Sequence, residues 1–301
     1  MAITLFTNSS AMSASNALQK ANSTLSSAME HLGTGKRITK ASDDAAGLQV
    51  ATRLQGQSNG MAVAQRNIAD ASTMLQTGEG SMDEVSNIMY RMKDLATQGA
   101  TDTNTAESRK AIDAELTSLN TELKSIMGNT SYAGNKLFSS TTDDKNNVTV
   151  TGKMGSAMTF QTGAESGETT SVNVSDQLKS VLTSINTLSS ASVQDTADSS
   201  GAVTATGTSK ANALIDTLSS ALDNVSSLRS SFGASINSLG HASANLTNMK
   251  DNTDQALGNI QDADFASEAS KMTRSQMLAQ TSTSMLKQSN SMSSLVMSIL
   301  G

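Results

Sequence analysis

The sequence predicts a mainly α-helical protein: an elongated antiparallel helical rod whose N- and C-terminal helices pair as a coiled coil, with a small β-hairpin region. Three observations support this prediction. Apolar residues recur at alternating steps of three and four along most of the chain, as on one face of an α-helix. The 301 residues include no Pro, which would break a long helix. Aromatic residues make up only 2%, so Ala, Leu, Ile, Val and Met must form most of the core.

The first predicted helix has a narrow apolar face of small and medium side chains. Its members follow one another without a gap and are Ala14, Leu18, Ala21, Leu25, Ala28 and Leu32. Residues 32–37 then read LGTGKR, and the two glycines predict a hinge before the next helix.

The second predicted helix continues the spacing over a much longer stretch. Its apolar positions are Val50, Leu54, Met61, Ala64, Ile68, Ala71, Leu75, Met82, Val85, Met89, Met92 and Ala96. Only Gln57 and Gly78 interrupt the series. At about 1.5 Å per residue the helix would be roughly 70 Å long. Ser42 is predicted as its N-cap, because the acidic Asp43 and Asp44 that follow favour the positive end of a helix.

A third helix, short strands and a loop are predicted in the middle of the chain. The helix carries Ile112, Leu116, Leu119, Leu123 and Ile126, folds back through a polar turn at residues 101–105, and ends at Gly128 and Asn129. Between residues 139 and 175 the pieces NVTVTG, AMTFQTG and TTSVNV alternate apolar and polar residues, which predicts two or three strands. Residues 191–209 are mostly Ser, Thr, Asp, Gly and Ala, and predict a loop or surface insert.

Two more helices are predicted to return along the first ones. One carries Leu214, Leu218, Ala221, Val225, Leu228, Phe232, Leu239, Ala242, Leu246, Met249, Ala256 and Ile260. The last carries Leu278, Met285, Met292 and Ile299 at seven-residue spacing, with Leu295 between the last two. We expect these five residues to pack against the first helix as a coiled coil. A bundle closed within one molecule is the alternative, but it offers no further local helix to cover the terminal faces.

Three parts are therefore expected. Residues 1–42 and 261–301 form a terminal coiled-coil domain, and residues 43–138 and 210–260 form a helical rod domain. Residues 139–209 form the β-hairpin and a short variable surface region.

The composition excludes several kinds of chemistry. There is no Cys and there are only two His, His31 and His241, so thiolate and histidine-rich metal sites are disfavoured. A net charge of −6 disfavours nucleic-acid binding. No apolar run is long enough to span a membrane, and the N-terminus lacks the features of a cleaved secretory signal. We therefore expect no membrane segment and export, if any, by another route.

Fragments that resemble catalytic or metal sites are better read as structure. Ser284-Met-Leu-Lys287 fits S-x-x-K, but its companion motifs are absent. Asp262, Asp264 and Glu268 lack the glycine and glutamate of a calcium loop and are typical of a helix start. We expect no catalytic, cofactor-binding or metal site, and so no enzyme.

Two long segments resemble the bacterial flagellin family. Residues 35–100 begin GKRITKASDDAAGLQVATRLQGQSNG, and residues 260–290 read IQDADFASEASKMTRSQMLAQTSTSMLKQSN. In flagellins the paired termini form the inner tube of the filament and the long helices form the next shell. The segment GAESGETTSVNV is similar to the family's hairpin, and the short stretch after it implies a small subunit without large outer domains.

The resemblance implies a function and a set of partners. The chain is expected to be secreted and to self-assemble as the structural subunit of an extracellular flagellar filament used for motility. The implied partners are other copies of itself, the flagellar cap and hook-junction proteins, and a cytoplasmic type III export chaperone that covers residues 276–300. A host Toll-like receptor is also implied, through Arg91, Leu95 and Glu115. The assembly residues are expected to be Ala14, Leu18, Ala21, Leu25, Leu32, Leu278, Met285, Met292, Leu295 and Ile299.

Two other functions remain open at this point. A hook-filament junction protein shares the terminal helices, although the block from Asp43 to Ala100 resembles filament subunits more closely. A signalling or adhesive coiled-coil protein outside the family would stay unpolymerised with intact termini.

Overall fold

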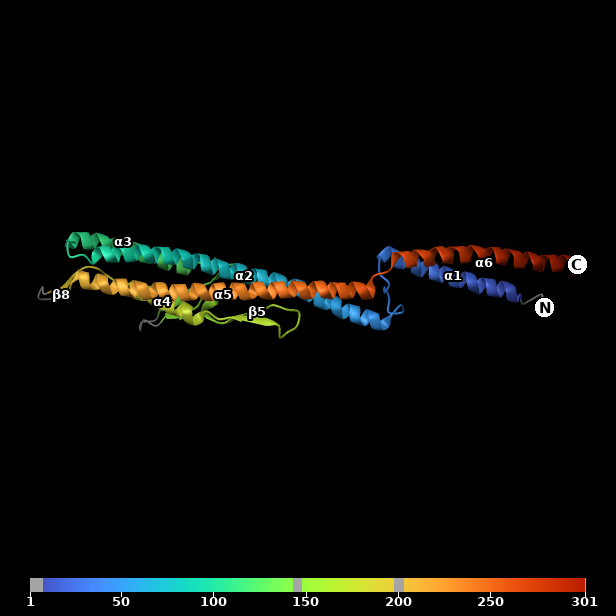
Figure 1. Ribbon diagram of the computed structural model, residues 1–301, viewed down its shortest axis with the longest axis horizontal. Coiled ribbons are helices and arrows are strands. Elements are labelled where there is room, and N and C mark those ends of the chain that lie inside the picture. Colours follow the sequence, from blue (N-terminus) through green and yellow to red (C-terminus); the bar gives the residue numbers. More distant parts are fainter. Residues whose placement is uncertain (1–7, 143–147, 198–202, 301) are drawn as a thin grey trace. The chain divides into compact units, whose positions relative to one another are not determined.

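The computed structural model describes residues 8–142, 148–197 and 203–300 (Figure 1). The chain divides into two compact units. Unit 1 runs to Ser58 and resumes at Lys250, and unit 2 comprises Asn59–Met249. The two longest helices, α2 (Ala45–Gly99) and α5 (Gly207–Gln261), each contribute to both units. The three-part division expected from the sequence stays a prediction.

Unit 1 is built on the two terminal helices, α1 (Ser9–Thr34) and α6 (Phe265–Leu300), which lie side by side (Figure 1). The side chain of Asn8 caps α1 by accepting a hydrogen bond from the Ala11 amide at 3.1 Å. Gly35 ends α1 with φ of 70°, a left-handed conformation that glycine adopts without strain.

The N-cap predicted for the second helix was wrong by two residues. Helix α2 begins at Ala45, and Asp44 caps it by accepting a hydrogen bond from the Gly47 amide at 2.8 Å. Asp43 instead accepts hydrogen bonds within the preceding turn, from the amides of Thr39 and Lys40. The acidic pair thus ends one turn and begins the next helix, and Ser42 takes no part in the cap.

In unit 2, α3 (Ala106–Asn129) folds back through the predicted polar turn, and Thr105 caps it by accepting from the Ser108 amide at 3.2 Å. The apolar faces predicted for α2 and α5 are buried in unit 2 over most of their length, but Ala242 is half-buried and the predicted Met249 is exposed. The members of this core from the two helices include Met61, Ala64, Ile68, Ala71, Leu75, Met82, Val85, Met89, Met92, Ala96, Leu214, Leu218, Ala221, Val225, Leu228, Phe232, Leu239 and Leu246. Val50, predicted as the first member, is exposed in unit 1.

The gap at Gly78 in the α2 series has a structural cause. A Cβ atom at this position would lie 3.3 Å from the Phe138 ring and 3.4 Å from the Phe232 ring. The two rings contact each other with centroids 6.4 Å apart, and both are fully buried with Met154. The glycine therefore leaves room for bulky side chains that come from elsewhere in the chain.

The middle of the chain forms short antiparallel pairs. These are β1 (Ser131–Tyr132) with β2 (Asn135–Lys136), β3 (Ser140–Thr142) with β4 (Val148–Val150), β5 (Met158–Gln161) with β6 (Thr169–Val172), and β7 (Thr196–Ala197) with β8 (Val203–Ala205). The three predicted strand segments correspond to β4, β5 and β6, and the predicted hairpin is β5–β6, in register from Met158 opposite Val172 to Gln161 opposite Thr169. A short 3-10 turn, Lys153–Gly155, lies between β4 and β5.

The structure contains one helix that was not predicted from the sequence. Residues Ser175–Leu188 form α4, whose buried face consists of Leu178, Val181, Leu182, Ile185 and Leu188. These residues follow the helical spacing, so the signal was present, but it lay between strand-like and loop-like segments and was assigned to neither a helix nor a strand.

Two charged side chains of α3 hold the segment that leads from α4 to α5. The Arg109 guanidinium donates to Asp195 at 3.2 Å and to the Thr208 hydroxyl at 2.9 Å. One turn later the Asp113 carboxylate accepts from the Val193 amide at 2.9 Å and from the Gln194 side chain at 2.7 Å. Both ends of the β7–β8 hairpin are therefore fixed to α3.

Candidate functional site on the terminal helices

The apolar face predicted for α1 is the face that packs on α6. Ala14, Ala21 and Ala28 are buried, and the three leucines between and beyond them are half-buried. The alternation of alanine and leucine gives a flat surface on which a second helix can approach closely. The role of this face in assembly stays a prediction.

The face of α6 that meets α1 consists mainly of small and polar residues. Glu268, Ser275 and Ser282 are buried at seven-residue spacing, and the half-buried side chains of this face are Met272, Ala279, Leu286 and Ser289. Near the other end of the pair, the Asn8 amide donates to the Ser289 hydroxyl at 2.8 Å. The buried positions of the pair are therefore alanines on α1, and a glutamate and two serines on α6.

The residues predicted to form the α6 side of this contact lie elsewhere on the helix. Leu278, Met285 and Met292 are 52%, 62% and 56% exposed, so the prediction that they pack on α1 was wrong for this chain. Each of them follows a serine of the face that meets α1 by three residues, so its side chain points roughly 60° away from that face around the helix. The side chains of Leu295 and Ile299 lie outside the described residues.

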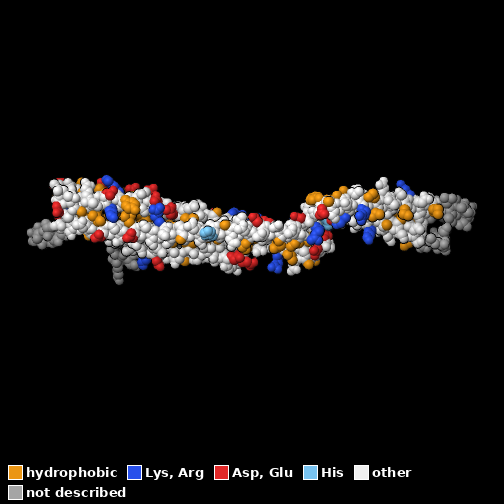
Figure 2. Space-filling view, in the orientation of Figure 1, with side chains coloured by type: hydrophobic (Ala, Val, Ile, Leu, Met, Phe, Trp, Pro, Cys, Tyr) orange, Lys and Arg blue, Asp and Glu red, His pale blue; other side chains and the backbone are white. Residues whose placement is uncertain are grey.

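The terminal pair instead carries an uncovered apolar surface. We call Leu278, Met285 and Met292 the α6 stripe. Met277 on α6 and Met12 and Met29 on α1 are also largely exposed. Figure 2 shows apolar side chains interspersed with Lys and Arg over the helices of unit 1. Large apolar side chains that are exposed together on a protein surface are a sign of an interaction site.

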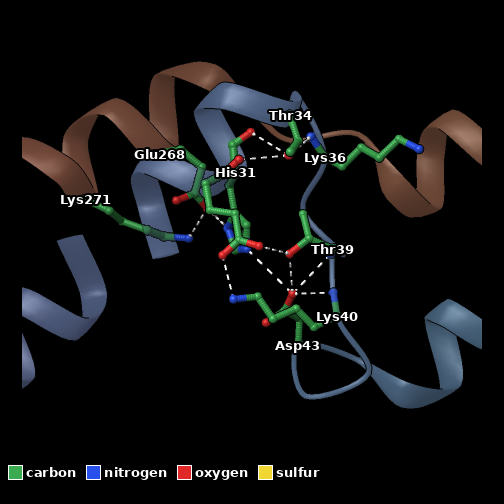
Figure 3. Close-up of polar contacts among 9 residues, drawn as sticks. His31, Thr34, Lys36, Thr39, Lys40, Asp43, Glu268 and Lys271 are labelled. Carbon is green, nitrogen blue, oxygen red and sulfur yellow. Dashed lines mark hydrogen bonds and ion pairs between the residues drawn. The ribbon is translucent and has the colours of Figure 1, made fainter. Parts of the chain in front are cut away.

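A polar cluster joins α1, the turn after it and α6 (Figure 3). His31 lies with Nε2 3.8 Å from Asp43 and Nδ1 3.7 Å from Glu268, and the Lys271 ammonium pairs with the same Glu268 oxygen at 2.7 Å. Lys40 pairs with Glu30 at 2.6 Å. These contacts hold the C-terminal end of α1 against the start of α6.

The two connecting segments of unit 1 also pair directly. The Arg37 amide donates to the Gln261 carbonyl at 2.6 Å, and the Ala263 amide donates to the Gly35 carbonyl at 2.9 Å. Glu268, considered above as part of an acidic group, is therefore a buried structural residue. Over the described residues, no group of three or more His, Cys, Asp and Glu side chains is arranged to hold a metal ion.

The turn at Asp43 gives a pH-dependent prediction. Hydrogen bonds from the amides of Thr39 and Lys40 hold the pKa of the Asp43 carboxyl below its usual range. A lowered pKa in the folded state stabilises the fold above the unfolded pKa, and this stabilisation is lost as the pH falls through the folded pKa. Asp43→Asn should therefore lower the Tm at neutral pH, and its difference from wild type should shrink at a pH below both values. Thermal unfolding followed by circular dichroism at the two pH values measures this.

The control for this experiment is Asp70→Asn, which changes an exposed carboxylate of α2. This substitution should change the Tm little at either pH. A Tm difference for Asp43→Asn that is equal at neutral and acidic pH would contradict the explanation.

The three residues of the implied receptor contact do not share one surface. Arg91 on α2 and Glu115 on α3 are exposed and form an ion pair of 2.7 Å. Leu95 is only 3% exposed and belongs to the unit 2 core. Its position one turn after Arg91 suggested a common exposed face, but its side chain lies in the core cluster that also contains Ile112 and Leu116 of α3.

Comparison with known proteins identifies the family. The bacterial flagellin N-terminal helical region matches residues 5–143, and the bacterial flagellin C-terminal helical region matches residues 215–300. The chain belongs to the bacterial flagellin family. Flagellins are a family of structural proteins. The part of this chain between the two matched regions contains β4 to β8 and α4.

Curated flagellins are similar to this chain over more than half of its length. Flagellin C of Vibrio cholerae is 43% identical over 176 residues, which are 58% of this chain and 43% of that protein. Flagellin A of Vibrio anguillarum is 46% identical over 168 residues, which are 56% of this chain and 41% of that protein. The matched part is thus less than half the length of either relative.

A solved structure from Vibrio parahaemolyticus, of a protein named as flagellar hook-associated, shares the fold. It is 20% identical with a TM-score of 0.54, covering 73% of this chain and all of that one. Of the flagellin helices that the structure describes here, none combines the length and apolar character of a membrane-spanning segment.

Proposed function

We propose that this flagellin is the structural subunit of a bacterial flagellar filament and that it self-assembles through its terminal helices. The observation that carries the proposal is the α6 stripe, an exposed row of Leu278, Met285 and Met292 on a helix whose other face is already covered by α1. An apolar row of this kind is stable in water when neighbouring subunits cover it. The proposed role is mechanical, and it needs no catalytic or cofactor-binding residue.

Electron microscopy of the purified chain, seeded with short filament fragments, tests the proposal. Long helical filaments are expected. A protein that forms only short, limited assemblies would favour the hook-filament junction function. A protein that stays monomeric with helical ends would favour a non-polymerising coiled-coil function.

The same proposal includes secretion and a location in the extracellular filament. In this scheme the cap and hook-junction proteins contact the chain during assembly, and an export chaperone covers residues 276–300 beforehand. The α6 stripe supports the chaperone contact, because an apolar helix face must be shielded from aggregation before assembly. A pull-down of the chaperone should fail when these residues are removed, and intact binding would contradict this part of the proposal.

Recognition by a host Toll-like receptor is proposed for Arg91 and Glu115, since both are exposed and Arg is frequently an interface anchor. Leu95 contributes by shaping the core beneath them. Arg91→Ala should weaken receptor activation, measured with a reporter cell line. Lys93→Ala, two residues away on the same helix, is the control, and equal activation by wild type and Arg91→Ala would contradict the proposal.

A further inference from the structure

A groove between α1 and α6 is both cationic and apolar. It has a volume of about 400 Å³ and is lined by Lys20 of α1 and by Lys271, Arg274 and Leu278 of α6. Lys271 already pairs with Glu268. Lys20 and Arg274 form no ion pair within the described part of the chain. The groove thus presents two uncompensated positive charges beside the first residue of the α6 stripe.

The turn from α5 into α6 has complementary chemistry. Asp262 and Asp264 are exposed, and neither has a cationic partner among the described residues. Phe265, next in the chain, is 59% exposed. The turn therefore offers two negative charges and an aromatic ring, where the groove offers two positive charges and a leucine.

These two surfaces cannot neutralise each other within one subunit. Arg274 of α6 lies ten residues after Asp264, the residue that caps this helix, which is a separation of about 15 Å along the helix axis. That distance exceeds the Debye length of about 8 Å at physiological salt. A second copy displaced along the helix direction would bring the two surfaces together.

We propose that the groove formed by Lys20, Arg274 and Leu278 receives residues 262–265 of a neighbouring copy of the chain. This inference rests on the proposed filament function and names a contact within it. Such a contact joins two different surfaces, so it repeats from subunit to subunit and builds a helical polymer instead of a closed dimer. Local charge pairing also offsets the mutual repulsion of subunits that each carry a net charge of −6.

A charge exchange tests the contact. Arg274→Asp and Asp262→Arg should each raise the critical concentration for polymerisation by about tenfold, because each leaves like charges facing across the interface. The double variant should return to near the wild-type value, because the pair is restored with reversed sign. Asp262 is preferred to Asp264, whose carboxylate caps α6 through the Ala266 amide. Sedimentation of seeded polymers measures the critical concentration.

Lys287→Glu is the matched control, since Lys287 is an exposed cation of α6 outside the groove. Combined with Asp262→Arg it should give no rescue. Circular dichroism of each monomer must match wild type, so that misfolding is not counted as lost contact. Single variants that polymerise like wild type, or a double variant no better than the singles, would overturn the inference. A wild-type chain that forms no filaments would instead overturn the proposed function, and this contact with it.

Discussion

A chain that lacks residues 270–301 should form no filaments while keeping the helical structure of unit 2. The deletion removes the α6 stripe and uncovers the face of α1 that contains Ala14, Ala21 and Ala28. Unit 2 ends at Met249 and has its own continuous core, so its stability does not depend on α6. Sedimentation should find only soluble protein, and circular dichroism should report a helical loss confined to α1 and α6.

A second variant separates the helix pair from the assembly surface. Replacing Leu278, Met285 and Met292 together by serine should leave the α1–α6 helix pair intact, because all three side chains are largely exposed and none is among the buried residues of the pair. This variant should retain the helical signal of wild type and still fail to polymerise. Long filaments from either variant would refute the assignment of the terminal helices as the assembly element. Loss of most helical signal after the deletion would refute the independence of unit 2.

Phe232→Ala should cause a large loss of stability in unit 2. Its ring is fully buried against Phe138, at the position where Gly78 makes room for both. Truncating a buried phenylalanine costs about 3–5 kcal/mol, from lost apolar burial and from the cavity that remains. Guanidinium chloride unfolding followed by circular dichroism measures the change.

Tyr90→Ala is the control for this substitution, since Tyr90 is an exposed aromatic residue of α2. Tyr90→Ala should change the free energy of unfolding by no more than about 0.5 kcal/mol, as most surface substitutions do. A Phe232→Ala chain about as stable as Tyr90→Ala would mean that the aromatic contact adds little to the unit 2 core.

The long helices could be predicted from the sequence because their buried residues are large and regularly spaced. Along α2, every predicted position from Met61 to Ala96 is buried. The gap at Gly78 could not be explained in the same way, because its cause is Phe138 and Phe232, which are distant in sequence. Local periodicity carries no information about such long-range partners.

The site on the terminal helices was predicted in part. The α1 face was correct, but the larger apolar residues of α6 were taken as its partner, and the structure uses Ser275 and Ser282 instead. The serines and the α6 stripe both repeat every seven residues along α6. The larger apolar side chains of the α6 stripe made it the expected partner of α1. The alanines on α1 indicated the correct partner, because a helix face of small side chains packs closely against small side chains of the other helix.

Leu95 illustrates a related limit. Helical spacing places Leu95 one turn after Arg91 on the same side of α2, but the tertiary packing of the unit 2 core determines which part of that side remains in water. Arg109 and Asp113 were also missed, since charged residues on a helix are usually solvated, and nothing local in the sequence indicates that they bind a distant loop.

The attachment of the β7–β8 hairpin to α3 bears on how flagellins of different length can share one core. Asp113 fixes the chain at Val193 on one side, and Arg109 fixes it at Thr208 on the other. Between two such anchors, each doubling of the loop length costs only about 0.6 kcal/mol of closure entropy. Extra sequence inserted here would leave the packing of the long helices unchanged, so this segment can vary in length while the core of unit 2 stays the same.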